Sequence, residues 1–151
     1  MTKGMPTEEY AIIVPTTYEQ EHYEAVIRLM AQLTTRDIVF TPEMYRELIT
    51  SASNQLMLLQ AAEGAVVGML TLGIYGSPTG SKAWIEDVVV DESYRGRSLG
   101  RRLVAHAIDV AREKGIDTLM LTSNPKRIAA NELYRSLGFE KKETNMYKMK
   151  L

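Results

Sequence analysis

The chain has 151 residues, of which 45% are hydrophobic and 25% are charged, and these values predict a single globular domain over residues 1–151. Its 18 basic and 19 acidic side chains give a net charge of -1, which excludes a protein-wide positive field for nucleic-acid binding, so any anion site must be local. The absence of cysteine excludes disulfides, thiolate metal sites and a cysteine nucleophile, and it fits a reducing cytoplasm.

The start of the chain carries charges and a proline where a signal peptide needs an apolar stretch, and no run in the sequence is long enough for a transmembrane helix. We therefore expect a cytoplasmic protein with no membrane partner. We expect no metal either, because His22 and His106 are the only histidines and lie far apart in the sequence.

The first elements in chain order are a strand and two helices. A short apolar run predicts the strand over residues 10–14, and apolar residues at helical spacing predict a helix over residues 18–33. A Thr-Pro-Glu sequence that begins at residue 41 is typical of a helix start and predicts a second helix to about residue 51.

The middle of the chain predicts three strands. Residues 56–62 and 65–75 are apolar and flank a Glu-Gly turn, which indicates an antiparallel hairpin. Residues 76–80 contain glycine, serine and proline and predict a flexible loop. Residues 84–90 are rich in branched side chains and predict a buried strand.

The last third of the chain alternates between helices and strands. Leu99, Leu103, Ala107 and Val110 recur at helical spacing, and the helix they predict stops at Gly115. A strand over residues 118–122, a helix over 126–137 and two short strands over 139–143 and 144–149 complete the prediction. The pattern as a whole indicates an α/β or α+β fold in which helices pack on a mixed sheet.

The sequence RGRSLGRR, residues 95–102, lies where a strand is followed by a helix start. Free N–H groups and the helix dipole favour an anion there, glycines allow its close approach, and four arginines supply charge. The alternative is an ordinary turn with a solvated arginine face. The dinucleotide fingerprint is not met, because Ser98 replaces its middle glycine, and no P-loop pattern is present.

The same segment resembles the Q/R-x-x-G-x-G/A acetyl-CoA motif of the Gcn5-related N-acetyltransferase (GNAT) superfamily, with Arg95 in its first position and Gly100 in its last. The preceding WIEDVVVDESY resembles the central strand of that family, and NELYRSLGF resembles its later helix and strand. Ser98 departs from the motif and narrows the room for a diphosphate.

The resemblance implies a GNAT fold with a mixed sheet whose central strand and following strand splay apart to admit acetyl-CoA as co-substrate. It implies that the central strand hydrogen-bonds the pantetheine arm, that the turn holds the diphosphate through its main chain, and that two asparagines contact the cofactor arm. The implied cofactor-binding residues are Val88, Val89, Val90, Arg95, Gly96, Arg97, Ser98, Leu99, Gly100, Arg101, Asn124 and Asn131. For Asn124 and Asn131, purely structural roles are an equal alternative.

Acyl transfer to an amine needs a base for the amine and an acid for the leaving thiolate. Tyr134 matches the general-acid tyrosine of the family, and its alternative is a core tyrosine on an apolar helix face. Glu86 and Asp87 lie in an otherwise apolar strand and are candidates for the base, or else partners of a nearby Arg or Lys. Strand alternation predicts that they point to opposite faces, so only one can face the cleft.

The resemblance predicts an acetyl-CoA-dependent N-acetyltransferase that acts on a primary amine of a small molecule, an amino sugar or a peptide. The amino sugar enters because IEDVVV and RGRSLG also resemble glucosamine-6-phosphate acetyltransferases. The alternative is a non-catalytic acyl-CoA-binding regulatory module on the same fold. Nucleic acid is not an expected partner, and a homodimer is compatible with the sequence.

Overall fold

The computed structural model describes residues 9–151, which divide into two compact units, one that ends at Leu121 and one that comprises Thr122–Leu151. The start of the chain, where we expected no targeting segment, lies outside the described residues. Within residues 9–151, no helix is both long enough and apolar enough to span a membrane.

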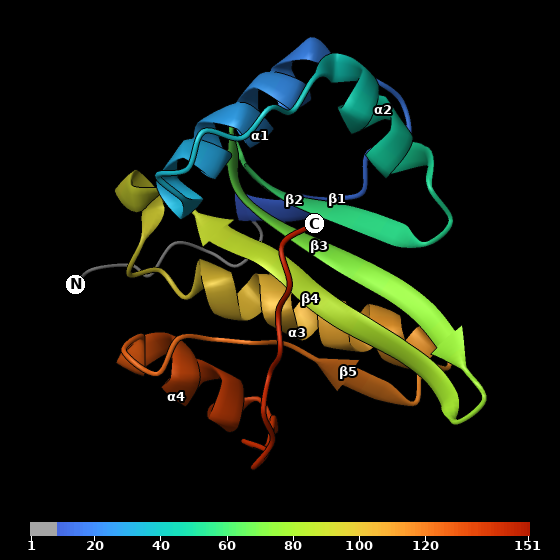
Figure 1. Cartoon of the computed structure of the whole chain (residues 1–151). Coiled ribbons are helices and arrows are strands. Elements are labelled where there is room, and N and C mark those ends of the chain that lie inside the picture. Colours follow the sequence, from blue (N-terminus) through green and yellow to red (C-terminus); the bar gives the residue numbers. More distant parts are fainter. Residues whose placement is uncertain (1–8) are drawn as a thin grey trace. The chain divides into compact units, whose positions relative to one another are not determined.

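The first unit contains a five-stranded sheet in the order β1-β2-β3-β4-β5 (Figure 1). Strands β1 (Tyr10–Ile13), β2 (Asn54–Ala61), β3 (Val66–Ser77) and β4 (Gly80–Val90) form an antiparallel series. Strand β5 (Thr118–Met120) then pairs with β4 in parallel. The sheet is therefore mixed, as the sequence predicted.

The two hairpins of this sheet differ in how well the sequence predicted them. The β2–β3 hairpin turns at Gly64 with φ +98°, which confirms the expected turn. The flexible loop predicted for residues 76–80 is wrong, because β3 and β4 stay paired up to Ser77 and Gly80. Gly80 has φ +133°, and the next residue, Ser81, donates its N–H to the Asp117 carboxylate at 3.0 Å.

Helices α1 (Gln20–Leu33) and α2 (Pro42–Thr50) lie on one face of the sheet, and α3 (Leu99–Glu113) lies on the other (Figure 1). Apolar residues of α1, including Leu29, form a buried cluster with residues of the strands, including Val89. Leu103 of α3 packs so closely on β3 that a Cβ at Gly68 would lie 3.2 Å from its Cδ1 atom. These contacts confirm the predicted α/β fold, in which helices pack on the sheet.

The second unit contains α4 (Ile128–Ser136), which ends before Gly138 with φ +102°. Phe139 folds back, donating its N–H to the Tyr134 carbonyl and packing edge-to-face on the Tyr134 ring at 6.0 Å. The two strands predicted for residues 139–143 and 144–149 are wrong, since the described residues form none there.

The alternation of apolar and lysine side chains in the last residues of the chain is the pattern of a half-buried strand. Tyr147, Met149 and Leu151 are nevertheless 86%, 81% and 109% exposed. A strand needs a neighbouring backbone as well as an alternating pattern, and the sequence pattern alone could not supply the partner.

Candidate functional site

The connection from β4 to α3 begins with the short helix η2 (Glu92–Tyr94) and continues as a turn over residues 95–98. Two residues of this turn have left-handed backbone angles, Gly96 with φ +80° and Ser98 with φ +59°. The first main-chain hydrogen bond of α3 runs from the Arg102 N–H to the Ser98 carbonyl at 3.2 Å. The N–H groups of Leu99 and Gly100 precede that bond and lie at the positive end of the helix dipole, which favours an anion.

Space is open beside the two glycines of this turn. A Cβ at Gly96 would meet no atom within 4 Å, and a Cβ at Gly100 would meet only Val90 Cγ2, at 3.9 Å. This distance is ordinary van der Waals contact, so packing within the unit does not require glycine at position 100. The missing side chain therefore leaves room for a ligand that approaches the main chain, rather than for another part of this unit.

The side chains of the arginines are partly used inside the protein. Arg97 Nη1 donates to the Tyr10 hydroxyl at 2.9 Å, and Arg102 Nη2 donates to the Tyr10 carbonyl at 2.9 Å. Arg95 Nε donates to the Val90 carbonyl at 3.2 Å. The charge expected from four arginines is thus drawn partly toward β1 and the end of β4.

The connection is also tied to α1. The Asp91 carboxylate accepts the Ser93 N–H at 3.0 Å and lies 3.7 Å from Arg28 Nε. The backbone bond from Ser93, supported by side-chain bonds and by the Arg28 charge, lowers the pKa of Asp91. Gln32 of α1 accepts the Glu92 N–H at 2.9 Å. These contacts fix the start of the turn before any ligand binds.

The pairing between strands β4 and β5 is short. Their parallel pairing joins Lys82, Ala83 and Trp84 to Thr118, Leu119 and Met120, and it ends there. Strand β4 runs on to Val90, so the segment that contains Val88, Val89 and Val90 extends beyond its pairing with β5 (Figure 1). An extended backbone beyond its neighbour can hydrogen-bond an added chain with amide groups.

A β-bulge interrupts β4 at Asp87, which has φ +52°. Thr71 pairs with Glu86 and Met69 pairs with Val89, so the one residue between Met69 and Thr71 faces two on β4. The bulge interrupts the regular alternation of β4 between Glu86 and Val89, and the expectation that Glu86 and Asp87 point to opposite faces stays a prediction. Asp is among the residues that adopt a left-handed backbone more readily, which explains how the bulge tolerates it.

Glu86 lies on the same face of the sheet as Thr71 and Val89. Val89 belongs to the core cluster that α1 and α2 cover, so this face is the one beneath those two helices. Partial burial, and after it the negative charge of Asp87, raises the pKa of Glu86. Of the two candidate bases, Glu86 is the carboxylate whose environment favours accepting a proton.

The other candidate residues belong to the second unit. Asn124 accepts the Lys126 N–H through its side-chain oxygen at 2.9 Å, and Asn131 donates its amide to the carbonyls of Asn124 and Arg127 at 2.9 and 2.7 Å. These bonds hold the start of α4 and show structural roles for both asparagines. Tyr134 is 8% exposed, beside Phe139.

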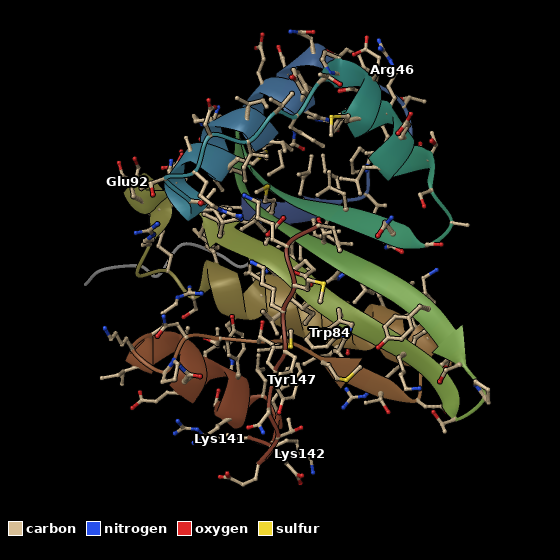
Figure 2. The ribbon with its side chains drawn as sticks, in the orientation of Figure 1. Arg46, Trp84, Glu92, Lys141, Lys142 and Tyr147 are labelled. Atoms are coloured by element: carbon tan, nitrogen blue, oxygen red, sulfur yellow. The ribbon has the colours of Figure 1, made fainter. Side chains whose placement is uncertain are left out.

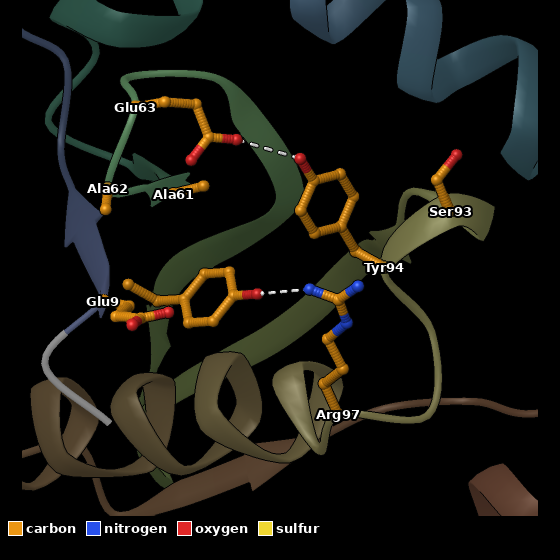
Figure 3. A pocket seen from close by; sticks show the side chains of 8 residues that line it. Glu9, Ala61, Ala62, Glu63, Ser93, Tyr94 and Arg97 are labelled. Atoms are coloured by element: carbon orange, nitrogen blue, oxygen red, sulfur yellow. Dashed lines mark hydrogen bonds between the residues drawn. The ribbon is translucent and has the colours of Figure 1, made fainter. Parts of the chain in front are cut away.

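Sequence reasoning missed Tyr10, Glu63 and Tyr94, which lie around the turn. Tyr94 donates its hydroxyl to Glu63 Oε1 at 2.9 Å, and that bond raises the pKa of Tyr94. A pocket of about 280 Å³ lies beside these residues (Figure 3). Its lining comprises Glu9, Tyr10, Ala61, Ala62, Glu63, Ser93, Tyr94 and Arg97. No local motif connects these positions, because they come from β1, the β2–β3 turn and η2, which are far apart in the sequence.

The described residues contain no group of three or more His, Cys, Asp or Glu side chains that could hold a metal ion. Figure 2 shows the side chains of the described residues, with Trp84 on β4 and Glu92 at the start of η2 among those labelled.

Residues 21–139 match the acetyltransferase (GNAT) family. A glucosamine 6-phosphate N-acetyltransferase of Trypanosoma brucei brucei is 40% identical over 86 residues, which are 55% of this chain and 56% of that protein. The N-alpha-acetyltransferase RimI of Mycobacterium tuberculosis is 29% identical over 113 residues, which are 75% of this chain and 69% of that protein. The chain thus spans about half the length of the trypanosomal relative.

Solved structures agree. A Trypanosoma brucei acetyltransferase superposes with a TM-score of 0.77 at 26% identity, covering 94% of this chain and 99% of that one. The protein AAC(6')-Iy, solved with a bisubstrate analogue that contains CoA, superposes with a TM-score of 0.77 at 19% identity, covering 94% of this chain and 98% of that one, and shows the shared fold. The chain belongs to the GNAT acetyltransferase family, which confirms the resemblance and the fold class inferred from the sequence.

Proposed function

We propose that this chain is an N-acetyltransferase that transfers an acetyl group from acetyl-CoA to a primary amine of a small molecule, an amino sugar or a peptide. The observation that supports the proposal most is the turn after β4, where a helix N-terminus, open space beside Gly96 and Gly100, and a strand extending beyond its neighbour occur together. Membership of the acetyltransferase family supports the same reaction.

The donor would be held in two places by groups of the chain itself. The main chain of Val88, Val89 and Val90 extends beyond β5 and offers amide groups to the pantetheine arm. The N–H groups from Gly96 to Arg101 offer donors to the diphosphate, including those at the start of α3. Asn124 and Asn131 would contribute only what their hydrogen bonds within the α4 start leave available.

The reaction forms a C–N bond and breaks the C–S bond of the thioester. Glu86 would take a proton from the attacking amine, directly or through a water molecule, and its raised pKa makes its carboxylate a better proton acceptor than an ordinary glutamate. Tyr134 would give a proton to the departing thiolate, because a phenol keeps its proton at neutral pH. Asp87 is assigned to the bulge and not to proton transfer.

The acceptor is tested by a screen of amines with acetyl-CoA in which release of free thiol is followed. Amino sugars come first, because a relative that is 40% identical over 86 residues is a glucosamine 6-phosphate N-acetyltransferase, and peptide N-termini and aminoglycosides follow. Amine-dependent thiol release with one class supports the proposal. Tight acetyl-CoA binding without thiol release from any amine would favour the non-catalytic acyl-CoA-binding module instead. The cytoplasmic location and a homodimer stay predictions.

A further inference from the structure

We propose that the Arg97 side chain supports the anion-binding turn through Tyr10 and Tyr94, and that contact with the diphosphate is left to the main chain of the turn. The inference rests on the proposed function, because it concerns how this turn is shaped for the donor. It makes the side chains of Arg97, Tyr10, Tyr94 and Glu63 positioning groups rather than ligands of the donor.

The backbone next to Arg97 needs such support. Gly96 adopts φ +80° freely because it has no Cβ atom, but Ser98 has φ +59°, and this left-handed backbone is strained for a residue with a Cβ atom. Ser98 is the N-cap of α3, yet its side chain makes no capping hydrogen bond that would offset this cost. A strained conformation of this kind persists only where the surrounding structure holds it.

The Arg97 guanidinium is held on two sides. Its Nη1 donates to the Tyr10 hydroxyl at 2.9 Å, and its carbon lies 5.0 Å from the centroid of the Tyr94 ring, within the range of a cation–π contact. Tyr10 is only 6% exposed and belongs to β1, so the acceptor is fixed in the sheet. Figure 3 shows the Arg97 guanidinium near Tyr94, with a dashed line that marks its hydrogen bond.

Tyr94 is fixed in turn. Its hydroxyl donates to Glu63 Oε1 at 2.9 Å, and Glu63 lies in the turn between β2 and β3 (Figure 3). Glu63, Tyr94, Arg97 and Tyr10 thus form a continuous chain of contacts, which we call the strut. The strut joins the anion-binding turn to the edge strand β1 and to the turn between β2 and β3, and it turns the Arg97 charge toward β1.

A double-mutant cycle tests this role. We expect Tyr10→Phe and Arg97→Gln each to raise the Kd of acetyl-CoA about two- to tenfold, the range of one hydrogen bond. We expect the double variant to bind no more weakly than the weaker single variant, because both changes break one strut. The Kd of S-acetylpantetheine, which lacks the diphosphate, should stay at the wild-type value in all three variants.

Two variants serve as comparisons. Tyr23→Phe also removes a tyrosine hydroxyl, one that donates to the Phe40 carbonyl at 2.6 Å, and should leave both Kd values unchanged. Tyr94→Phe keeps the ring under Arg97 while it removes the bond to Glu63, so it should weaken acetyl-CoA binding less than Tyr94→Leu does. Melting temperatures show that each variant is folded.

Other results would overturn the inference. If Arg97 bound the phosphate directly, Arg97→Gln would weaken acetyl-CoA binding and Tyr10→Phe would not. If the two residues had independent roles, the two losses of affinity would multiply in the double variant. Equal losses for acetyl-CoA and S-acetylpantetheine would indicate a general structural effect. Wild-type protein that binds no acetyl-CoA would instead remove the proposed function, and with it the site that the strut supports.

Discussion

A carboxylate in the middle of an apolar strand needs a reason to be there, because an ionised side chain that loses water is costly. At Glu86 the pKa is raised by partial burial and by Asp87, and the residue faces the side of the sheet that α1 and α2 cover. At Asp87 the bulge supplies the reason, since the backbone has φ +52° there. We therefore propose different roles for the two adjacent carboxylates.

This difference predicts unequal effects on the rate. Glu86→Gln should lower kcat/KM, with the largest loss at low pH, where the amine is mostly protonated and most needs a base. Asp87→Asn should leave the rate close to that of wild type, because Asn also tolerates a left-handed backbone. Steady-state rates from pH 6 to 9 measure both, and equal, small effects would point to water as the base.

The raised pKa of Glu86 also predicts a change in stability with pH. A carboxyl group whose folded pKa is raised supports folding at low pH, and this support is lost as the pH rises from the unfolded value through the folded one. Glu86→Gln should therefore melt at a higher temperature than wild type at pH 7, and the difference should shrink toward pH 4. A difference that grows at low pH would contradict the sign of the shift.

Tyr134 gives the third prediction at this scale. Tyr134→Phe keeps the ring on Phe139, so folding and acetyl-CoA affinity should hardly change. Loss of a general acid should lower kcat by roughly 100- to 10,000-fold if thiolate departure limits the rate. We would measure kcat, acetyl-CoA binding and the melting temperature on one preparation. Full activity in a less stable variant would make Tyr134 a core residue only.

At the scale of elements, the sequence predicted what local patterns determine. The start of α3, its buried stripe and the β2–β3 turn follow from spacing and glycine. The bulge at Asp87 could not be predicted, because it depends on which β3 residue opposes it. The strut was missed because its residues come together only in the folded sheet. The C-terminal strands were wrongly predicted, because alternation does not supply a partner strand.

Gly100 carries the prediction for the turn. Gly100→Glu should abolish the stabilisation by acetyl-CoA, because it places a bulky negative group beside the helix N-terminus that would bind the diphosphate. The fold should tolerate it, since a Cβ there meets only Val90 at 3.9 Å. Gly76→Glu is a matched control, because it adds the same charge in open space near the C-terminal end of β3. Equal thermal shifts with acetyl-CoA in both variants would indicate that the donor binds at another site.

At the scale of the whole molecule, the mixed sheet and the family were predictable from the sequence. The 56-residue span from Trp84 to Phe139 carried the family motifs, and the family match extends over residues 21–139. The acceptor was not predictable, because the sequence has no motif that identifies a particular amine. The single-domain prediction for residues 1–151 stays a prediction.

The most direct test of the account is a thermal-shift titration of the wild-type protein with acetyl-CoA and, in parallel, with S-acetylpantetheine. Binding to the folded state should stabilise the protein by about 2.7 kcal/mol at 100 times the Kd, so the melting temperature should rise steadily with the logarithm of the acetyl-CoA concentration. S-acetylpantetheine should need a much higher concentration for the same rise, because it lacks the diphosphate. No shift with millimolar acetyl-CoA, or the same shift at the same concentration of both compounds, would contradict the claim that the turn after β4 binds the donor.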